Sequence, residues 1–339
     1  MNIQQAIAQL VAGTNLTEED MVEVMNQVMT GEATPIQVGA FLTALRIQGE
    51  SVEEVTGAAR VMREKALHVD AGEQGCVLDT CGTGGDGKNT FNISTTVAFV
   101  VAAAGITVAK HGNRAVSSGS GSADVLGALG VKIDVPKEMV EQCLREVGLG
   151  FLFAPAMHGA MKYAAAPRRE VGIRTIFNLL GPLTNPARAT HQLLGIYDGA
   201  LIETVAQVLG NLGSERAMVV HGEEGLDEIS LGGPTAVAEW KDGAVDRYTL
   251  NPEEFGFEKC PAERLTASDP EECAAMVTAV LEGEPGPARD VVLINSGAAL
   301  CVSERVPTMA EGISLARERI DSGAALDKLQ HLIRLTNEA

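Results

Sequence analysis

The sequence has 339 residues, of which 45% are hydrophobic and 4% aromatic, and it carries a formal net charge of −19. So acidic a chain repels nucleic acids and anionic membranes, and it has few aromatic side chains for stacking bases, so we expect neither partner. The six cysteines form no CxxC pair, the N-terminus lacks the basic region of a signal peptide, and no apolar run is long enough to span a bilayer. These features predict a cytoplasmic protein with reduced thiols.

The first seventy residues show the pattern of a small all-helical domain. Three helix starts carry capping signals, in which a hydroxyl or a proline prepares the first turn. They are Thr17 with Asp20, Thr34 with Pro35, and Ser51 with Glu54. Apolar residues recur at helical spacing, and the faces carry no converging polar groups. We therefore expect residues 1–70 to serve packing or a subunit interface rather than catalysis.

From residue 75 onward, strand-like and helix-like segments alternate. The expected strands are 76–78, 106–109, 131–134, 150–154, 193–197 and 217–221, followed by a hairpin over 235–250. The expected helices are 123–129, 136–147, 158–178 with a break at Pro167, 200–212, 268–283, 288–301, 307–320 and 323–335. Such alternation predicts an α/β domain with a mainly parallel sheet and helices on both faces.

A glycine-rich loop follows the first of these strands. It runs from Gly82 to Gly87 and is followed by Asn89, Thr90, Asn92, Ser94 and Thr95. Glycines allow the backbone to approach an anion closely, and hydroxyl and amide groups donate to phosphate oxygens. The spacing is neither that of a P-loop nor that of a Rossmann turn. A phosphate site and a tight surface turn are therefore both open interpretations.

A second polar loop follows the strand expected at 106–109. From Lys110 to Ser118 it supplies two cations, one histidine, one amide and two hydroxyls. In so acidic a chain, this cluster at the end of a strand suits an anion at the carboxyl edge of a parallel sheet. The alternative is a solvated basic turn.

An acidic loop follows the strand expected at 217–221. From His221 to Glu228 it places adjacent carboxylates beside glycines. Oxygen ligands of this kind commonly hold Mg²⁺ together with substrate phosphates, although a solvated acidic loop is the alternative.

The segment between Lys162 and Arg188 is basic, with five Lys or Arg residues against the single acid Glu170. It could bind a carboxylate, which arginine recognises with two parallel hydrogen bonds. For Arg169 and Arg174 we expect surface salt bridges instead.

Four motifs occur in a fixed order along the chain: DTCGTGGDGKNTFNIST, VAKHGNRAVSSGSGSADVLGALG, GIRTIFNLLGPLTNPA and HGEEGLDE. Together they resemble the anthranilate phosphoribosyltransferase family over essentially the whole chain. The resemblance implies transfer of the 5-phosphoribosyl group from phosphoribosyl pyrophosphate to the amine of anthranilate, with release of pyrophosphate, in tryptophan biosynthesis. It also implies the nucleoside-phosphorylase type of fold, Mg²⁺ as cofactor and a homodimer formed through the small domain. In that fold, helices from about 158–190 join residues 1–70, and residues 75–339 form the α/β domain.

The resemblance further implies roles for single residues. Phosphoribosyl pyrophosphate would contact Gly82, Gly85, Asp86, Thr90, Asn92, Ile93, Ser94, Thr95, Lys110, His111, Gly112, Asn113, Arg114, Ala115, Val116, Ser117, Ser118 and Ser122. Of these, Lys110, His111 and Arg114 would be catalytic, and His111 either accepts a proton or only binds. Mg²⁺ would be held by Ser94, Asp227 and Glu228. Anthranilate would contact Gly82, Asn113 and Arg168, with Arg169 as the alternative to Arg168.

Two other functions stay open on the sequence alone. A pyrimidine nucleoside phosphorylase shares this type of fold and a similar KHGN loop, but is typically longer. A non-catalytic relative could bind nucleic acid, although the net charge of −19 and the complete metal motif argue against this.

Overall fold

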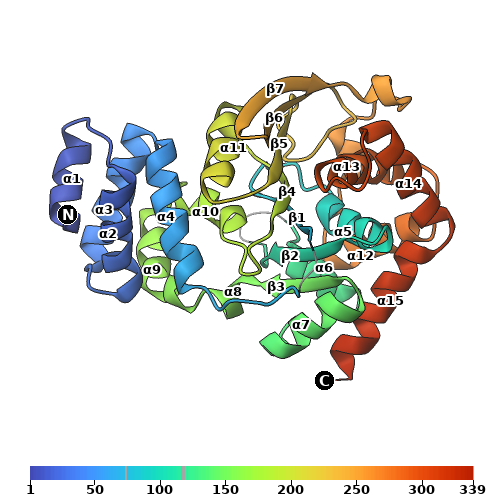
Figure 1. The fold of residues 1–339 in the computed structure, drawn as a ribbon, viewed down its shortest axis with the longest axis horizontal. Helices are drawn as coiled ribbons and strands as arrows, with labels where there is room; N and C mark the ends of the chain where they lie inside the picture. Colours follow the sequence, from blue (N-terminus) through green and yellow to red (C-terminus); the bar gives the residue numbers. More distant parts are fainter. Residues whose placement is uncertain (73–74, 116–118, 339) are drawn as a thin grey trace.

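The structure, a computed structural model, describes residues 1–72, 75–115 and 119–338, which form a helical unit and a larger α/β unit (Figure 1). The strands are β1 Val77–Gly82, β2 Thr107–Gly112, β3 Leu149–Phe153, β4 His191–Gly195, β5 Arg216–Gly222, β6 Thr235–Lys241 and β7 Ala244–Leu250. The helices are α1 Ile3–Val11, α2 Glu18–Thr30, α3 Pro35–Gln48, α4 Val52–Lys65, α5 Ile93–Ala103, α6 Ser122–Ala128, α7 Lys137–Glu146, α8 Ala154–Met157, α9 Lys162–Val171, α10 Phe177–Leu183, α11 Ile202–Asn211, α12 Pro270–Leu281, α13 Pro287–Val302, α14 Met309–Asp321 and α15 Ala324–Asn337. Short 3₁₀ turns cover Gly159–Met161, Gly199–Leu201, Pro252–Phe255 and Ala262–Leu265.

The helices of the N-terminal unit begin where their caps predict. The Thr17 side chain accepts the N–H of Asp20 at the start of α2, and Ser51 and Glu54 satisfy each other's backbone N–H groups at the start of α4. These bonds occupy donors that would otherwise lack partners in the first turn. The apolar faces of α1–α4 pack together with α9 and α10, and Figure 1 shows this group beside the sheet.

The sheet has the order β3-β2-β1-β4-β5-β6-β7, and β1 to β5 are parallel. The chain proceeds from β1 to β2 and β3 on one side, then returns to β4 and β5 on the other. The strand order therefore reverses between β1 and β4, which is where open α/β sheets bind ligands. The predicted α/β class with a mainly parallel sheet is confirmed.

Alternate residues of the strands enter two apolar layers, as the two-residue period of a strand requires. Leu193 and Val220 pack with α5 and the C-terminal helices, whereas Leu194 and Val219 pack with α10, α11 and the helical unit. Beyond its first turn, helix α5 is apolar on all sides, which suits its place between the sheet and α13 to α15 (Figure 1). In the part of the chain that the structure describes, no helix has the length and apolar character needed to cross a bilayer.

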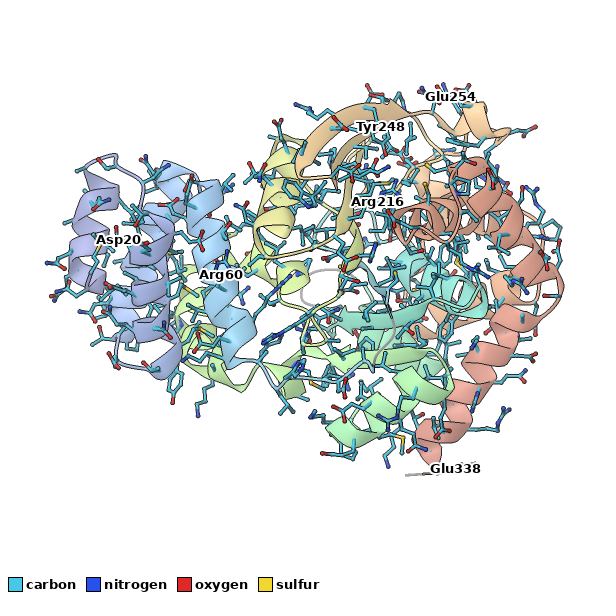
Figure 2. All side chains as sticks on the ribbon, viewed as in Figure 1. Asp20, Arg60, Arg216, Tyr248, Glu254 and Glu338 are labelled. Atoms are coloured by element: carbon cyan, nitrogen blue, oxygen red, sulfur yellow. The ribbon has the colours of Figure 1, made fainter. Side chains whose placement is uncertain are left out.

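The predicted hairpin of the antiparallel strands β6 and β7 turns at Asp242 and Gly243, which have φ of 52° and 82° as a two-residue Asp-Gly turn requires. A partly buried polar cluster fixes it to the parallel sheet. Glu239 accepts hydrogen bonds from Arg216 Nε (2.7 Å) and from Tyr248 Oη (2.7 Å). Figure 2 labels Arg216 and Tyr248 at this end of the sheet. The hairpin therefore extends the parallel part of the sheet by two antiparallel strands.

Three local expectations were wrong. Residues 131–134 form no strand, because the N–H of Val131 binds Leu126 O in α6 and the N–H of Lys132 binds Thr336 Oγ1 (3.2 Å) on α15. Helix α9 continues through Pro167 and ends at Gly172, where φ is 67°. Strands β1 and β2 are longer than expected, so Gly82 and the segment Lys110–Gly112 lie in the sheet and not in loops.

Candidate active site

The glycine loop, residues 82–87, leaves the sheet where the strand order reverses. Gly82, the last residue of β1, pairs with Gly195 in β4. A Cβ at Gly82 would lie 2.5 Å from Asp227 Oδ2 and would displace that carboxylate, and one at Gly195 would overlap the Asp227 carbonyl, so only glycine fits at position 195. Gly84 donates its N–H to Asp227 Oδ2 (2.8 Å). The close backbone packing thus brings the Asp227 carboxylate against the loop.

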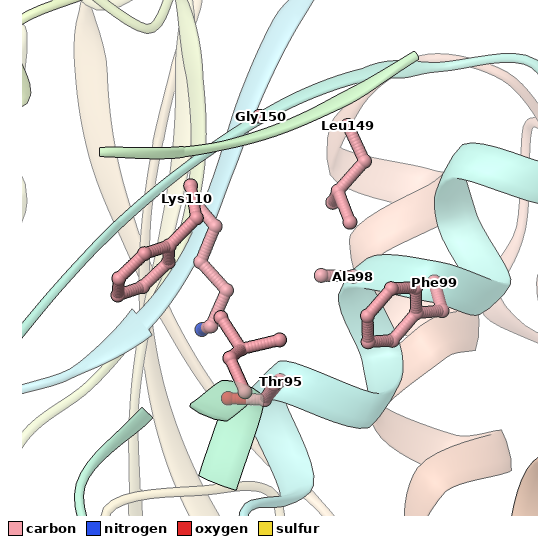
Figure 3. Close-up of a pocket in the computed structure, with 8 residues that line it drawn as sticks. Thr95, Ala98, Phe99, Lys110, Leu149 and Gly150 are labelled. Carbon is pink, nitrogen blue, oxygen red and sulfur yellow. The ribbon is translucent and has the colours of Figure 1, made fainter. Parts of the chain in front are cut away.

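The ammonium group of Lys110 is buried where β1, β2 and α5 meet. Lys110 is 3% exposed, and its Nζ donates to Thr80 O (2.6 Å) and to Ser94 Oγ (3.3 Å). Figure 3 shows the side chain extending from β2 toward Thr95 in the first turn of α5. Burial lowers the pKa of Lys110, and the Asp79 carboxylate opposes that shift. A cation is therefore held beside the N-terminus of α5, which itself favours an anion.

The two carboxylates of the acidic loop lie beside this N-terminus. Glu228 is buried and accepts the N–H of Ser94 (3.1 Å). Burial and the neighbouring Asp86 raise the pKa of Asp227 to about 7, and burial and Asp227 raise the pKa of Glu228. The carboxylates of Asp86, Asp227 and Glu228 thus lie close together, and a bound cation would reduce the repulsion between them.

These residues fit a hard divalent cation that is shared with a ligand. Asp86 Oδ2 is buried and has no hydrogen-bond partner. Among the described residues, no three His, Cys, Asp or Glu side chains are grouped closely enough to hold a metal by themselves. Mg²⁺ is commonly bound by one or two carboxylates, with phosphate oxygens and water as its other ligands. The donor set is therefore suitable for Mg²⁺ only together with phosphate.

The loop after β2 is closed at its base by Asp124. Its Oδ2 accepts the N–H groups of Ala115 (2.9 Å) and Gly121 (3.1 Å), and its Oδ1 accepts from Arg114 Nη1 (3.0 Å). Asn113 and Arg114 are exposed at this base, where they are accessible to a ligand. The predicted ligand contacts Val116, Ser117 and Ser118 lie outside the described residues.

Arg168 lies on α9 with its guanidinium 4.9 Å from the centre of the Phe177 ring, at the start of α10. It is partly buried, and burial lowers its pKa, whereas Arg169 is exposed. At the other end of α10, the carbonyl of Gly181 lies 3.1 Å from His111 Nδ1. The short helix α10 thus links Arg168, the predicted carboxylate-binding arginine, to residues 110–113, the KHGN segment.

Arg174 does not form the expected surface salt bridge. Its Nη2 donates to Gly85 O in the glycine loop (2.6 Å), and its guanidinium lies 4.1 Å from the centre of the Tyr197 ring. The basic segment between α9 and α10 therefore reaches the glycine loop directly.

The other residues that were predicted to contact phosphoribosyl pyrophosphate differ in which of their groups a ligand could reach. Ile93 and Thr95 are 1% and 0% exposed, so only their backbone groups can face one. Thr90 forms an isolated bridge with Thr266, and Asn92 Oδ1 lies 3.4 Å from Ser120 Oγ. Hydrogen bonds join the glycine loop to Asp227, and Lys110 to Ser94 and Ser94 to Glu228. The two sets meet because Asp227 and Glu228 are consecutive residues.

Comparison with known proteins identifies the family. The model of the glycosyl transferase family, helical bundle domain, matches residues 4–66, and that of the glycosyl transferase family, a/b domain, matches residues 74–326. The chain is 55% identical over 348 residues to the anthranilate phosphoribosyltransferase of Trichlorobacter lovleyi, covering 99% of this chain and 100% of that one. The chain belongs to the anthranilate phosphoribosyltransferase family. The resemblance seen in the four motifs is confirmed.

Solved structures of the family share the whole fold. The enzyme of Thermus thermophilus superposes with a TM-score of 0.93 at 43% identity, covering 98% of this chain and 99% of that one. The Saccharomyces cerevisiae enzyme in complex with PRPP and Mg gives a TM-score of 0.90 at 30% identity, covering 99% and 98%. Both parts of the chain therefore lie as they do in these relatives.

Asp79 and Asn185 are polar residues of the site that the sequence analysis did not single out. Asp79 is wholly buried, and its Oδ1 accepts the N–H of His111 (3.2 Å) while its Oδ2 accepts from Asn185 Nδ2 (2.8 Å). Asn185 Nδ2 also donates to Ala109 O (2.7 Å). A charged residue within an otherwise apolar strand was the available signal. These bonds fix the KHGN segment against the loop after α10.

His111 and His158 form a buried pair in this region. Their Nε2 atoms are 3.2 Å apart, and His111 Nδ1 donates to Gly181 O, since a carbonyl can only accept. Burial and the neighbouring His158 lower the pKa of His111 to about 3, and burial lowers the pKa of His158 to about 4. Both imidazoles are therefore neutral at physiological pH.

This pair predicts acid sensitivity. Because both folded-state pKa values lie below the ordinary 6.5, the unfolded chain binds more protons as the pH falls. Stability from this pair is fully present above about pH 6.5 and is lost as the pH falls toward 4. In a His158→Gln variant, the fall in Tm between pH 6.5 and 4.5 is expected to be shallower. Thermal scans across this range test it against His331→Gln on α15, and equal slopes in the two variants would contradict it.

Proposed function

We propose that the chain is an anthranilate phosphoribosyltransferase, which transfers the 5-phosphoribosyl group from phosphoribosyl pyrophosphate to the amine of anthranilate and releases pyrophosphate, a step of tryptophan biosynthesis. The observation that carries this is the match along 99% of the chain, at 55% identity, to a relative of that name. The cluster at the strand-order reversal supports it independently. A glycine-rich loop at the end of a strand, a buried ammonium and paired carboxylates suit a pyrophosphate ester with a divalent cation.

We assign the predicted residues to the two substrates. Those for phosphoribosyl pyrophosphate are Gly82, Gly85, Asp86, Thr90, Asn92–Thr95, Lys110–Ser118 and Ser122. Those for anthranilate are Gly82, Asn113 and Arg168. Gly82 and Asn113 belong to both sets, so they mark the expected boundary between the two substrates.

We propose that Ser94, Asp227 and Glu228 hold Mg²⁺. The complex of the yeast relative with PRPP and Mg supports this, as do the crowded carboxylates and the partnerless Asp86 Oδ2. When bound, the ion neutralises negative charge on the pyrophosphate. The protein's own contribution is to hold these oxygens beside the glycine loop through the bonds to Gly84 and Ser94.

The reaction calls for stabilising the leaving group more than for activating the nucleophile. Positive charge develops at the anomeric carbon and negative charge on the departing pyrophosphate. In this proposal, Lys110, Arg114 and the N–H groups of the loops stabilise that negative charge. The aromatic amine of anthranilate is already neutral at pH 7, so positioning supplies much of the rate. His111 uses both ring nitrogens within the protein, which favours a positioning role over that of a base.

An Arg168→Ala variant is expected to raise the KM for anthranilate about 10- to 100-fold, because a charged hydrogen-bonding partner of the carboxylate is lost. The KM for phosphoribosyl pyrophosphate should change little. Arg169→Ala is the matched control, since Arg169 is the exposed neighbour on the same helix. Steady-state kinetics with each substrate varied in turn measures both. Equal effects on the two substrates, or a larger effect of Arg169→Ala, would refute the assignment to Arg168.

We propose a homodimer through the helical unit. Ile36 and Ile47 lie on α3 and are 86% and 82% exposed, and a spacing of eleven residues places them on one face of the helix. So exposed a pair of large apolar side chains is typical of an interface. An Ile36→Asp variant is expected to sediment at half the mass of the unaltered protein. A mass that does not change on substitution would contradict this interface.

We also propose a cytoplasmic location, supported by six cysteines that are all free thiols. The helices from about 158–190 are proposed to belong with residues 1–70, because Ala164 and Phe177 pack in the same apolar cluster as α1–α4.

The experiment that tests the activity is a fluorescence assay of anthranilate consumption in the presence of phosphoribosyl pyrophosphate and Mg²⁺. Consumption that requires all components is expected. Phosphorolysis of thymidine without consumption of anthranilate would favour the nucleoside phosphorylase alternative and overturn the proposal.

A further inference from the structure

Arg174 joins two parts of the site that are 89 residues apart in the sequence, the segment between α9 and α10 and the glycine loop. Its side chain donates to Gly85 O and stacks over the ring of Tyr197. We propose that Arg174 is a positioning residue that holds the glycine loop in the shape that binds phosphoribosyl pyrophosphate. The inference rests on the proposed function for the identity of the ligand.

The glycine loop has little conformational preference of its own. Gly84, Gly85 and Gly87 have φ of 66°, 74° and 74°, in the left-handed region that glycine enters without cost. A Cβ added at Gly84 or Gly87 would meet nothing within 4 Å, so neighbouring atoms do not enclose the loop there. Its shape therefore depends on hydrogen bonds from other segments.

Three consecutive loop residues form such bonds with three different segments. The N–H of Thr83 donates to Gly195 O at the end of β4, and the N–H of Gly84 donates to Asp227 Oδ2. The carbonyl of Gly85 accepts from Arg174 Nη2. Tyr197 takes part twice, because its N–H donates to Thr83 Oγ1 (3.0 Å) while its ring carries the guanidinium of Arg174. The contacts thus form a closed cycle: Arg174 binds Gly85, the loop leads back to Thr83, and Tyr197 contacts both Thr83 and Arg174.

The backbone of Arg174 is itself fixed. Gly172, with φ of 67°, ends α9, and the N–H of Thr175 binds Asn178 Oδ1 (3.0 Å) at the start of α10. Only a short link therefore separates the two helices that carry Arg168 and the Gly181 carbonyl. Arg174 therefore connects the glycine loop to the end of α9, the helix that carries Arg168, which we assign to anthranilate.

Loss of this side chain should affect the loop more than the fold. Arg174 is exposed, so its removal opens no cavity in the core. Water can replace the donor at the Gly85 carbonyl, which leaves no buried group without a partner. The expected consequence is a looser loop within a folded protein.

Arg174→Ala is expected to raise the KM for phosphoribosyl pyrophosphate about tenfold, to lower kcat less than about threefold, and to leave the KM for anthranilate within about twofold. Arg174→Lys should recover only part of the loss, because an ammonium neither stacks flat on Tyr197 nor presents a planar fork. Arg145→Ala, which removes an exposed arginine on α7, is the matched control and should behave as the unaltered protein. An unchanged KM for phosphoribosyl pyrophosphate would overturn the proposal.

A readout without substrates separates loop positioning from direct ligand contact. Trypsin can cleave after Lys88, which directly follows the glycine loop. In the substrate-free protein, we expect the fragment ending at Lys88 to form several-fold faster in Arg174→Ala than in Arg145→Ala. A raised KM with equal cleavage rates would overturn the proposal, because Arg174 would then bind the ligand itself. If the unaltered protein consumes no anthranilate, the proposed function fails, whereas the cleavage comparison still tests the loop.

Discussion

An Asp227→Asn variant is expected to lose at least about 100-fold in kcat/KM and, without Mg²⁺, to unfold at a higher temperature than the unaltered protein. The carboxylate lies beside Asp86 and Glu228, so its removal relieves repulsion between like charges. Asparagine keeps an oxygen that can accept the N–H of Gly84, which preserves the attachment of the glycine loop. A loss of activity with a gain of stability identifies a residue kept for function and not for folding.

The matched control is Glu223→Gln, which removes an exposed carboxylate from the same loop. It should change neither kcat/KM nor Tm appreciably. Kinetics over a range of Mg²⁺ concentrations and thermal scans with and without Mg²⁺ measure both effects. A destabilised Asp227→Asn protein, or one with normal activity at ordinary Mg²⁺ concentration, would show that Asp227 has a structural role instead.

Local signals predicted most of the elements because they act within a few residues. The Thr17 and Ser51 caps each bind a backbone N–H three positions away, and the turn at Asp242 depends on the φ angle of that residue. The errors occurred where distant residues decide. Residues 131–134 have the composition of a strand, yet Thr336 on α15 takes the N–H of Lys132. No local pattern indicates a partner 204 positions away.

The residues of the site also divide into those that local signals could predict and those that depend on distant partners. Glycines, cations and carboxylates that follow strands could be predicted, because parallel strands bring their carboxyl ends to one edge. The motifs that carried the resemblance supplied the individual roles. Asp79 could not be linked to Asn185, 106 positions away. Arg174 was expected to form a surface salt bridge, because its actual partner is a backbone carbonyl that the sequence does not reveal. Any residue can accept a hydrogen bond at its backbone carbonyl, so such contacts cannot be predicted from the types of residue in the sequence.

Asp79→Asn is expected to lower the free energy of unfolding by about 1–3 kcal/mol, since an amide has one acceptor oxygen where the carboxylate has two. Asp79 accepts from His111 N and Asn185 Nδ2, and the new NH₂ group would face one of these donors. The variant also removes the negative charge that favours the protonated form of Lys110. We therefore expect kcat to fall together with stability.

The double variant Asp79→Asn, Asn185→Ala separates the two effects. Removing the second donor frees the oxygen of the introduced amide for the N–H of His111, so the stability losses should be less than additive by about 1 kcal/mol. The charge beside Lys110 stays absent, so kcat should not recover. Asp134→Asn, at an exposed carboxylate, is the control and should change stability by less than about 0.5 kcal/mol. Full recovery of kcat in the double variant would mean that Asp79 acts through the backbone of the KHGN segment and not through its charge.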